Sequence, residues 1–234
     1  MTDLDQARAD VVRYAQRMQA DGLVVGTAGN ISVRLDDRIV VTPSGVDYDL
    51  LTPDLICVCD LEGNQLAGPL RPTSELPMHL AVYAYTAHTA VVHTHSTAAT
   101  VVSTLVDEVP AIHYAIAFFG GPIRVAEYAT YGTEQLAENM LAALDGRTGC
   151  LLGNHGTVTV GDTLAGAYRL SQTLEWLCEL WLRAQAAGEP RLLSPEEIDR
   201  VAKRFADYGQ RPLRGDYGQR PPRGDYGQPP PQAT

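Results

Sequence analysis

The sequence predicts an α/β fold, a three-layer sandwich around a mainly antiparallel central sheet with helices on both faces. Segments with apolar residues at helical spacing are interspersed with short strand pairs that turn back on themselves. They do not alternate regularly as single strands and helices, which disfavours a parallel dinucleotide-binding sheet. The chain has 234 residues, of which 45% are hydrophobic, so it can bury a core of medium size.

The N-terminal part is expected to supply one helix and two hairpins. Residues 3–21 carry apolar residues at helical spacing and end at an Asp-Gly pair. The segment NISVRLDDRIVVTPSG is predicted as strand, turn and strand, with the bend at Asp36 and Asp37. LICVCDLEGNQLAG is predicted as a second hairpin. TSELPMHLAVYAYTAH is predicted as a helix with Thr73 as its N-cap.

The C-terminal part is expected to alternate between strands and helices. TAVVHTHS is a short buried strand, and STAATVVSTL is a helix. Residues 133–144 form a helix, the segment GCLLGNHGTVTVG forms a strand pair, and residues 162–187 form a long helix. SPEEIDRVAKRFADY is predicted as a last helix, capped by Ser194.

The end of the chain has a different composition. From Tyr208 a nine-residue unit recurs as YGQRPLRGD, YGQRPPRGD and YGQPPP, rich in Gly and Pro and almost without large aliphatic residues. Such a segment cannot bury enough apolar surface to offset the entropy lost on ordering. We therefore expect a folded domain at 1–208 and a disordered Pro/Gly/Arg-rich repeat tail at 209–234.

Charge and hydropathy narrow the function classes. The formal net charge of −10 disfavours binding to nucleic acid or to an anionic membrane, because both carry negative charge. No segment approaches eighteen uninterrupted apolar residues, so none is expected to span a bilayer. The amino terminus is acidic and lacks the pattern of a signal peptide. We expect a cytoplasmic protein.

Three histidines indicate a metal site. His93 and His95 lie two apart in an extended segment, so their imidazoles leave the same face of the strand. His155 lies in a glycine-flanked turn between two apolar strands, where glycine permits a close backbone approach. Three neutral imidazoles leave zinc an open coordination position, which is typical of a catalytic centre.

Other segments indicate acid–base chemistry and anion binding. Glu75 follows Thr73 and Ser74 at the start of a predicted helix, where it either complements the helix dipole or serves as an acid/base. The same helix start, and the small-residue loops at 26–30 and 42–45, have the hydroxyl and backbone donors that hold a phosphate. His79 lies four residues after Glu75 on the same predicted helix face, so it could approach the site, but a packing or capping role is favoured.

Seven segments, in their order along the chain, resemble the class II aldolase/epimerase family, which includes the adducin head domain. The resemblance covers essentially residues 1–208, leaves the tail unmatched, and is closest to the members that act on L-fuculose 1-phosphate. The segments are GTAGNIS at 26–32, TPSG at 42–45, TSE at 73–75, HTH at 93–95, PAIHY at 110–114, YATYGT at 128–133 and GNHG at 153–156.

The resemblance implies a zinc-dependent class II aldehyde-lyase of carbohydrate metabolism. It would reversibly cleave a ketose 1-phosphate of the L-fuculose 1-phosphate type into dihydroxyacetone phosphate and an aldehyde such as L-lactaldehyde. It also implies a homotetramer with its sites at subunit interfaces and one Zn²⁺ per subunit. The implied metal ligands are His93, His95, His155 and, when no substrate is bound, Glu75.

The resemblance further implies roles for individual residues. Glu75 would be the general acid/base, and Tyr114 would reach into a neighbouring subunit's site and donate a proton in the bond-breaking step. Tyr131 and Tyr208 would help to place the aldehyde half of the substrate. The implied phosphate-binding residues are Thr27, Gly29, Asn30, Ser44, Gly45, Thr73 and Ser74.

Lysine content and acidic residues separate related mechanisms. The only lysine is Lys203, in the last predicted helix, so a Schiff-base aldolase is disfavoured. Relatives that are L-ribulose-5-phosphate 4-epimerases carry Asp at the position of Glu75 and a further acidic residue near 111–123, and this segment has no carboxylate here. A sugar-phosphate dehydratase or decarboxylase stays open. A non-catalytic scaffold is expected to lack the imidazoles, and all three are present.

Overall fold

The structure is a computed structural model that describes residues 2–206. Its helices lie close to the predicted segments, and three short 3-10 helices join them. The α-helices are α1 (Asp3–Ala20), α2 (Leu76–Tyr85), α3 (Thr97–Val102), α4 (Glu134–Leu144), α5 (Leu164–Ala187) and α6 (Pro195–Ala206). The 3-10 helices are η1 (Tyr48–Leu50), η2 (Pro53–Leu55) and η3 (Tyr114–Phe119).

One sheet forms the middle layer of the described chain. Its strands are β1 (Asn30–Leu35), β2 (Arg38–Val41), β3 (Cys57–Asp60), β4 (Gln65–Ala67), β5 (Ala90–Thr94), β6 (Glu108–Val109), β7 (Ile123–Ala126), β8 (Gly149–Leu152) and β9 (Gly156–Gly161). Their order across the sheet is β4-β3-β2-β1-β5-β9-β8-β7-β6. Every neighbouring pair is antiparallel except β7 and β8, which are parallel.

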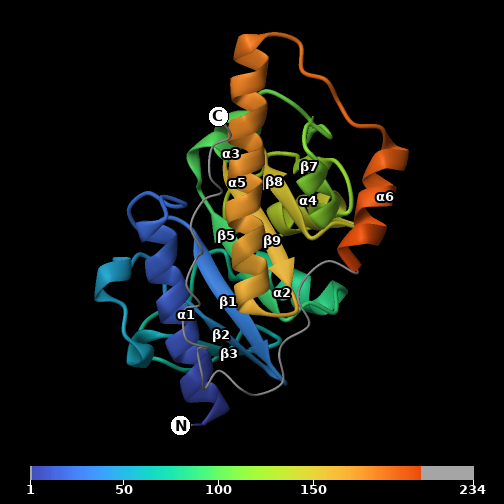
Figure 1. Cartoon of the computed structure of the whole chain (residues 1–234). Coiled ribbons are helices and arrows are strands. Elements are labelled where there is room, and N and C mark those ends of the chain that lie inside the picture. The colour runs from blue at the N-terminus through green and yellow to red at the C-terminus, as the bar shows by residue number, and fades with distance from the viewer. Residues whose placement is uncertain (1, 207–234) are drawn as a thin grey trace, which may run out of the picture.

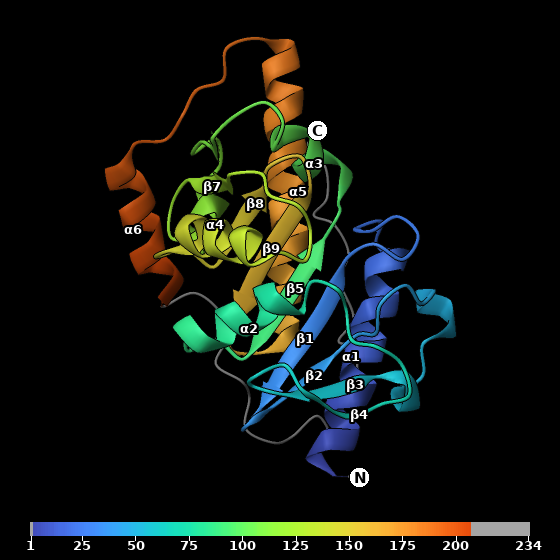
Figure 2. The ribbon, with the colours of Figure 1, turned by 180° about the vertical axis from the view of Figure 1, so that it is seen from behind.

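Helices cover both faces of this sheet. In Figure 1, α1 and α5 lie in front of the strands, and in Figure 2, which shows the opposite side, α2 and α4 lie in front. Val92 of β5 packs with the α1 and α5 side chains, whereas its neighbour Val91 packs with those of α2 and α4. The predicted α/β sandwich with a mainly antiparallel sheet is therefore confirmed.

The middle strand β5 determines on which face of the sheet the polar side chain of His93 lies. All five of its residues are buried, because helices cover the sheet on both sides. Since side chains alternate along a strand, His93 shares the α2/α4 face with Val91. Asn30 pairs with His93 across β1 and β5, and Ile31 packs on the opposite face. His93 and Asn30 are thus placed together beneath the start of α2.

The start of α2 differs from the sequence prediction. The N-cap is Glu75 rather than Thr73, and its backbone has φ −98° and ψ 15°. If Thr73 were the cap, the first helical hydrogen bond would require a backbone N–H at Pro77, which proline lacks. The Thr73 carbonyl instead accepts from the N–H of Leu76 in a tight turn, and the helix begins there.

The region 106–132, for which no element was predicted, contributes β6, η3 and β7, and so supplies one edge of the sheet. The proposed boundary at 208 and the repeat tail lie outside the described residues and stay predictions. Among residues 2–206, no helix combines the length and the apolar character needed to cross a membrane.

Gly156 is expected to be essential for the packing of β9 against β5. A Cβ at this position would lie 2.2 Å from the carbonyl oxygen of Thr94, a backbone atom that cannot move away alone. We predict that Gly156→Ala lowers the free energy of unfolding by at least about 2–3 kcal/mol, measured by urea denaturation. Gly166→Ala in α5 is the matched control, because there the added methyl meets only the Thr163 hydroxyl. Equal stability of the two variants would contradict this assignment.

Candidate active site

Two strands and one turn bring three imidazoles together. His93 lies in β5, and His95 follows directly after that strand. β9 runs antiparallel to β5, with Thr157 opposite Thr94, so the turn that precedes β9 places His155 beside the end of β5. The three ring centroids are 4.7–4.9 Å apart, and each pair of rings is close to perpendicular. The rings therefore surround one point.

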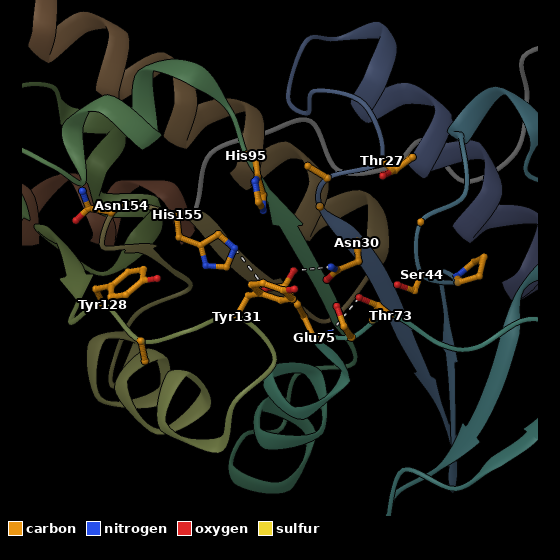
Figure 3. Close-up of a pocket in the computed structure, with 16 residues that line it drawn as sticks. Thr27, Asn30, Ser44, Thr73, Glu75, His95, Tyr128, Tyr131, Asn154 and His155 are labelled. Carbon is orange, nitrogen blue, oxygen red and sulfur yellow. Dashed lines mark hydrogen bonds and ion pairs between the residues drawn. The ribbon is translucent and has the colours of Figure 1, made fainter.

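The carboxylate of Glu75 reaches the same point from the start of α2. Its Oε2 lies 3.0 Å from Nε2 of His93, and its Oε1 lies 3.3 Å from Nε2 of His155. One ligand atom from each residue of this group lies within 4.8 Å of all the others. Figure 3 shows Glu75 between His155 and Asn30, with the dashed contacts to both. We call this group the His/Glu cluster; its members are Glu75, His93, His95 and His155.

The backbone before α2 holds Glu75 in this position. The N–H of Thr73 donates to the carbonyl of Thr42, and the N–H of Glu75 donates to the hydroxyl of Thr73 at 3.2 Å. Gly132, at φ +75°, packs so closely that a Cβ there would lie 2.7 Å from the carbonyl oxygen of Ser74. The turn at 73–75 is therefore fixed from both sides.

Burial and mutual proximity set the charges of the His/Glu cluster. Burial alone would raise the pKa of Glu75, but the imidazoles of His93 and His155 and the hydrogen bond from Asn30 lower it well below its usual range. Burial, followed by repulsion from His93, lowers the pKa of His95 to about 3 and that of His155 to about 4. At neutral pH, Glu75 is thus ionised and His95 and His155 are neutral, which are the forms that bind metals.

The cluster fits a metal ion such as zinc. The Nδ1–H of His93 donates to the carbonyl of Thr157 at 2.8 Å, which leaves its Nε2 lone pair directed at Nε2 of His95, 2.9 Å away. Oε1 of Glu75 is buried and has no hydrogen-bond partner in the described chain. The ligand atoms of a tetrahedral zinc site are about 3.3 Å apart, close to the shortest separations found here. A shared cation would satisfy all these atoms. A histidine that binds zinc commonly donates its other ring N–H to a backbone carbonyl, as His93 does here.

The cluster forms one wall of an open cavity of about 370 Å³ (Figure 3). Its walls come from the loops before β1 and after β2, the start of α2, and the turns before α4 and β9. The lining residues are Thr27, Ala28, Gly29, Asn30, Pro43, Ser44, Gly45, Thr73, Ser74, Glu75, His95, Tyr128, Ala129, Tyr131, Asn154 and His155.

The far wall of this cavity is built from small residues and hydroxyl groups. Gly29, at φ +77°, approaches β5 so closely that a Cβ would lie 2.8 Å from the carbonyl oxygen of His93. The hydroxyl of Tyr48 lies 2.9 and 2.7 Å from the carbonyl oxygens of Ala28 and Gly29, and these contacts hold the loop before β1 in place. None of the described residues that line the cavity is Lys or Arg. An anion held here would be bound by hydroxyl, amide and backbone N–H groups.

The structure brings most of the residues singled out in the sequence to this cavity. The seven expected phosphate-binding residues all line it, as do Tyr131, Glu75, His95 and His155, and His93 lies buried behind them. Tyr114 does not line it: this side chain is half exposed on η3, next to His113. Tyr208 lies outside the described residues.

Three residues near the site were not assigned to it from the sequence. Tyr128 and Asn154 line the cavity. The only signal for them was their place inside the segments YATYGT and GNHG. His79 is fully buried, as expected for a packing role, and its contact with Asn30 places it directly behind the site.

The sequence matches a known protein family. Residues 9–182 match the Class II Aldolase and Adducin N-terminal domain. The 5-deoxy-D-ribulose 1-phosphate aldolase of Bacillus thuringiensis is 36% identical over 211 residues, which are 89% of this chain and 99% of that protein. The L-fuculose phosphate aldolase of Escherichia coli K12 is 42% identical over 193 residues, 81% of this chain and 89% of that protein.

A solved structure agrees with these sequence relatives. An L-fuculose 1-phosphate aldolase superposes with a TM-score of 0.84 at 35% identity, and the match covers 88% of this chain and 98% of that one.

The geometry of the His/Glu cluster predicts tight binding of one Zn²⁺ per chain. When free zinc is about 1,000 times Kd, we expect stabilisation by about 4 kcal/mol, and hence a rise in Tm of roughly 10 °C that a chelator reverses. His95→Ala should abolish this rise, because it removes one donor. His88→Ala is the control, since His88 contacts Asp162 away from the cluster. Metal analysis and thermal unfolding test the prediction, and an unchanged zinc response in His95→Ala would contradict it.

Proposed function

The chain belongs to the Class II Aldolase and Adducin N-terminal domain family and is an enzyme of the aldehyde-lyase type, and from this premise we propose its reaction. We propose that it uses Zn²⁺ to cleave a ketose 1-phosphate reversibly into dihydroxyacetone phosphate and an aldehyde. The observation that carries the proposal is the convergence of three imidazoles and one buried carboxylate at a cavity lined by neutral anion-binding groups.

Cleavage next to a ketone leaves negative charge on the departing carbon fragment, so the site must stabilise that charge. Zn²⁺ held by the His/Glu cluster would supply a Lewis acid for the ketone oxygen. The alternative electron sink, a protonated Schiff base, needs a lysine at the cavity, but the only lysine of the sequence is Lys203, in α6, which does not line the cavity. A Schiff base with the substrate is therefore not part of the proposal.

Glu75 is proposed as the general acid/base. Its Oε2 is bound by Asn30, while Oε1 lies 3.3 Å from Nε2 of His155 and has no hydrogen-bond partner among residues 2–206, so one oxygen is anchored and the other is available. In the cleavage direction, the Glu75 carboxylate first takes up a proton from solvent and then gives it to the carbon fragment that becomes dihydroxyacetone phosphate. In the reverse direction, it takes that proton back. The low pKa of the carboxyl keeps Glu75 in its basic form at neutral pH.

The phosphate is proposed to lie against the small-residue wall of the cavity. Thr27, Ser44, Thr73 and Ser74 supply hydroxyl groups, and the glycine-containing loops supply backbone N–H groups. Gly29 and Gly45 both have positive φ, which glycine adopts without strain and which turns these loops around the cavity. A bound phosphate would thereby fix the distance from the reacting carbon to Glu75.

Tyr114 supports the proposal of an assembly. It is half exposed and lies outside this cavity, next to the exposed Phe118 on η3. In cleavage, the hydroxyl on the fourth carbon loses its proton as it becomes the aldehyde carbonyl, and in the reverse direction the aldehyde oxygen takes a proton up; Tyr114 would accept and return this proton in the site of a neighbouring copy. We therefore propose a homotetramer with sites at the subunit interfaces, acting in the cytoplasm. Tyr131 lines the cavity and is proposed to contact the aldehyde half of the substrate.

Two substrates are proposed for the aldehyde half. The first is 5-deoxy-D-ribulose 1-phosphate, because the match to a relative named for that sugar covers 99% of the relative's length. The higher identity to a relative named for L-fuculose phosphate supports the second. Cleavage between the third and fourth carbons gives dihydroxyacetone phosphate from both. The aldehyde is acetaldehyde in the first case and L-lactaldehyde in the second.

Substrate choice is tested by a panel of sugar phosphates. We expect the zinc-loaded chain to release dihydroxyacetone phosphate from 5-deoxyribulose 1-phosphate, L-fuculose 1-phosphate or both, because both carry a phosphate on the first carbon and a ketone on the second. Release is measured by coupled reduction of the product, with rhamnulose 1-phosphate and ribulose 5-phosphate alongside. Epimerisation of ribulose 5-phosphate without release of dihydroxyacetone phosphate would contradict the aldolase assignment and indicate the related epimerase.

The role of Glu75 is tested by proton exchange. We predict that Glu75→Gln slows exchange of the reacting C–H proton of dihydroxyacetone phosphate with solvent by about 100-fold or more, because the amide cannot accept the proton. The exchange is followed by NMR in D₂O, and zinc content is measured on the same sample. Glu134→Gln, at the exposed start of α4, is the control. Exchange at the wild-type rate in zinc-loaded Glu75→Gln would exclude Glu75 as the base.

A further inference from the structure

A row of buried polar side chains leads from the interior to Glu75. Glu75 caps α2, and His79 and Tyr83 follow it at steps of four residues, so the three side chains lie along one face of the helix. On β1, Asn30 and Ser32 are two residues apart and lie on one face of the strand. The four residues behind Glu75 are each no more than 3% exposed. The polar side chains of α2 and β1 thus alternate along a buried row that solvent does not reach.

Four short hydrogen bonds connect these residues in sequence. The hydroxyl of Tyr83 lies 2.6 Å from that of Ser32, which lies 2.6 Å from Nδ1 of His79. Nε2 of His79 lies 2.5 Å from Oδ1 of Asn30, and Nδ2 of Asn30 donates to Oε2 of Glu75 at 2.9 Å. The last contact is drawn in Figure 3.

The carboxylate at the end determines the direction of every bond in the row. An ionised carboxylate only accepts, so Asn30 must present its amide N–H to Glu75. Its carbonyl oxygen then faces Nε2 of His79, which must carry the ring proton. Nδ1 is therefore an acceptor and receives the Ser32 hydroxyl, whose oxygen in turn accepts from Tyr83. One tautomer of His79 satisfies the whole row.

The ring is neutral at physiological pH. Burial, with a smaller contribution from repulsion by His93, lowers the pKa of His79 to about 3. A neutral ring has one donor and one acceptor, and here both are used. If Asn30 turned its amide over, its oxygen would face the Glu75 carboxylate and its N–H would face the N–H of His79. Both contacts would be repulsive, so the amide has only one favourable orientation.

We propose that His79 is a positioning residue for this reaction: as the neutral Nε2–H tautomer, it holds the Asn30 amide with its N–H groups toward Glu75 and the cavity. Asn30 has two amide hydrogens, of which one binds Glu75 and the other is left for a group bound in the cavity that Asn30 lines. The link of His79 to the reaction rests on the function proposed above. The orientation of the amide does not depend on that function.

A matched pair of substitutions tests the proposal. In His79→Gln, the amide nitrogen can take the place of Nε2 and still donate to Asn30. In His79→Asn, the shorter side chain can replace only Nδ1, and the contact with Asn30 is lost. Both replacements are neutral amides that remove the ring, so a role in filling space alone predicts similar losses in both.

We expect His79→Gln to keep kcat within about threefold of wild type and His79→Asn to lose about 10- to 100-fold, the usual loss when a partner of a metal-site residue is removed. In the zinc-loaded full chain, the Kd for inorganic phosphate, measured by calorimetry, should rise several-fold in His79→Asn only. Tm and zinc content of both variants are recorded. Equal kcat and equal phosphate affinity in the two folded variants would overturn the proposal.

A measurement on the wild-type chain covers the case in which the variants do not fold. ¹⁵N NMR of the imidazoles near neutral pH should show His79 with a protonated Nε2 and an unprotonated Nδ1, before and after addition of Zn²⁺. The Nδ1–H tautomer or a charged ring would overturn the proposal. Both the tautomer and the phosphate affinity are measured without turnover. If no sugar phosphate were cleaved, the aldolase proposal would fail while these two results still decided the orientation of Asn30.

Discussion

The site depends on four donor groups held within 4.8 Å of one another in a largely buried space. Such a group is stable only if something positive is shared among its members, because lone pairs that face each other without a proton or a metal repel. The backbone supports this arrangement from two sides. Antiparallel pairing of β5 with β9 sets the positions of His93 and His155, and the turn before α2 brings in Glu75. The same constraint that orders the cluster makes it suitable for a divalent metal.

The cavity next to the cluster is proposed to bind an anionic substrate, although the protein itself is acidic. The chain carries a formal charge of −10, and none of the described lining residues is basic. Binding of a phosphate is therefore proposed to rely on hydroxyl and backbone donors together with the metal. Neutral donors hold an anion by geometry, so the loops must be rigid. The close packing of Gly29 on β5 and the hydrogen bonds from Tyr48 provide that rigidity.

Rigid support extends one layer further into the protein. Asn30 contacts Glu75 and is itself held by His79, which Ser32 and Tyr83 hold in turn. Each of these bonds lies between α2 and β1, so the packing of helix on sheet also aligns the proposed base. A substitution far from the cavity can thereby alter the chemistry without touching the substrate. Buried polar rows of this kind are effective only when their members are paired, as Asn30, Ser32, His79 and Tyr83 are here.

The sequence by itself determined the α/β class, most helices and hairpins, and the segments that carry the site. These follow from periodicity and turn chemistry, which act between residues close together in the chain. Only the tertiary structure decided that Tyr114 lies outside the cavity of its own chain, and that Glu75 and His79 are both bound to Asn30. Those positions depend on strand register and on the packing of α2 against β1, which join residues more than forty positions apart. No local pattern encodes such contacts.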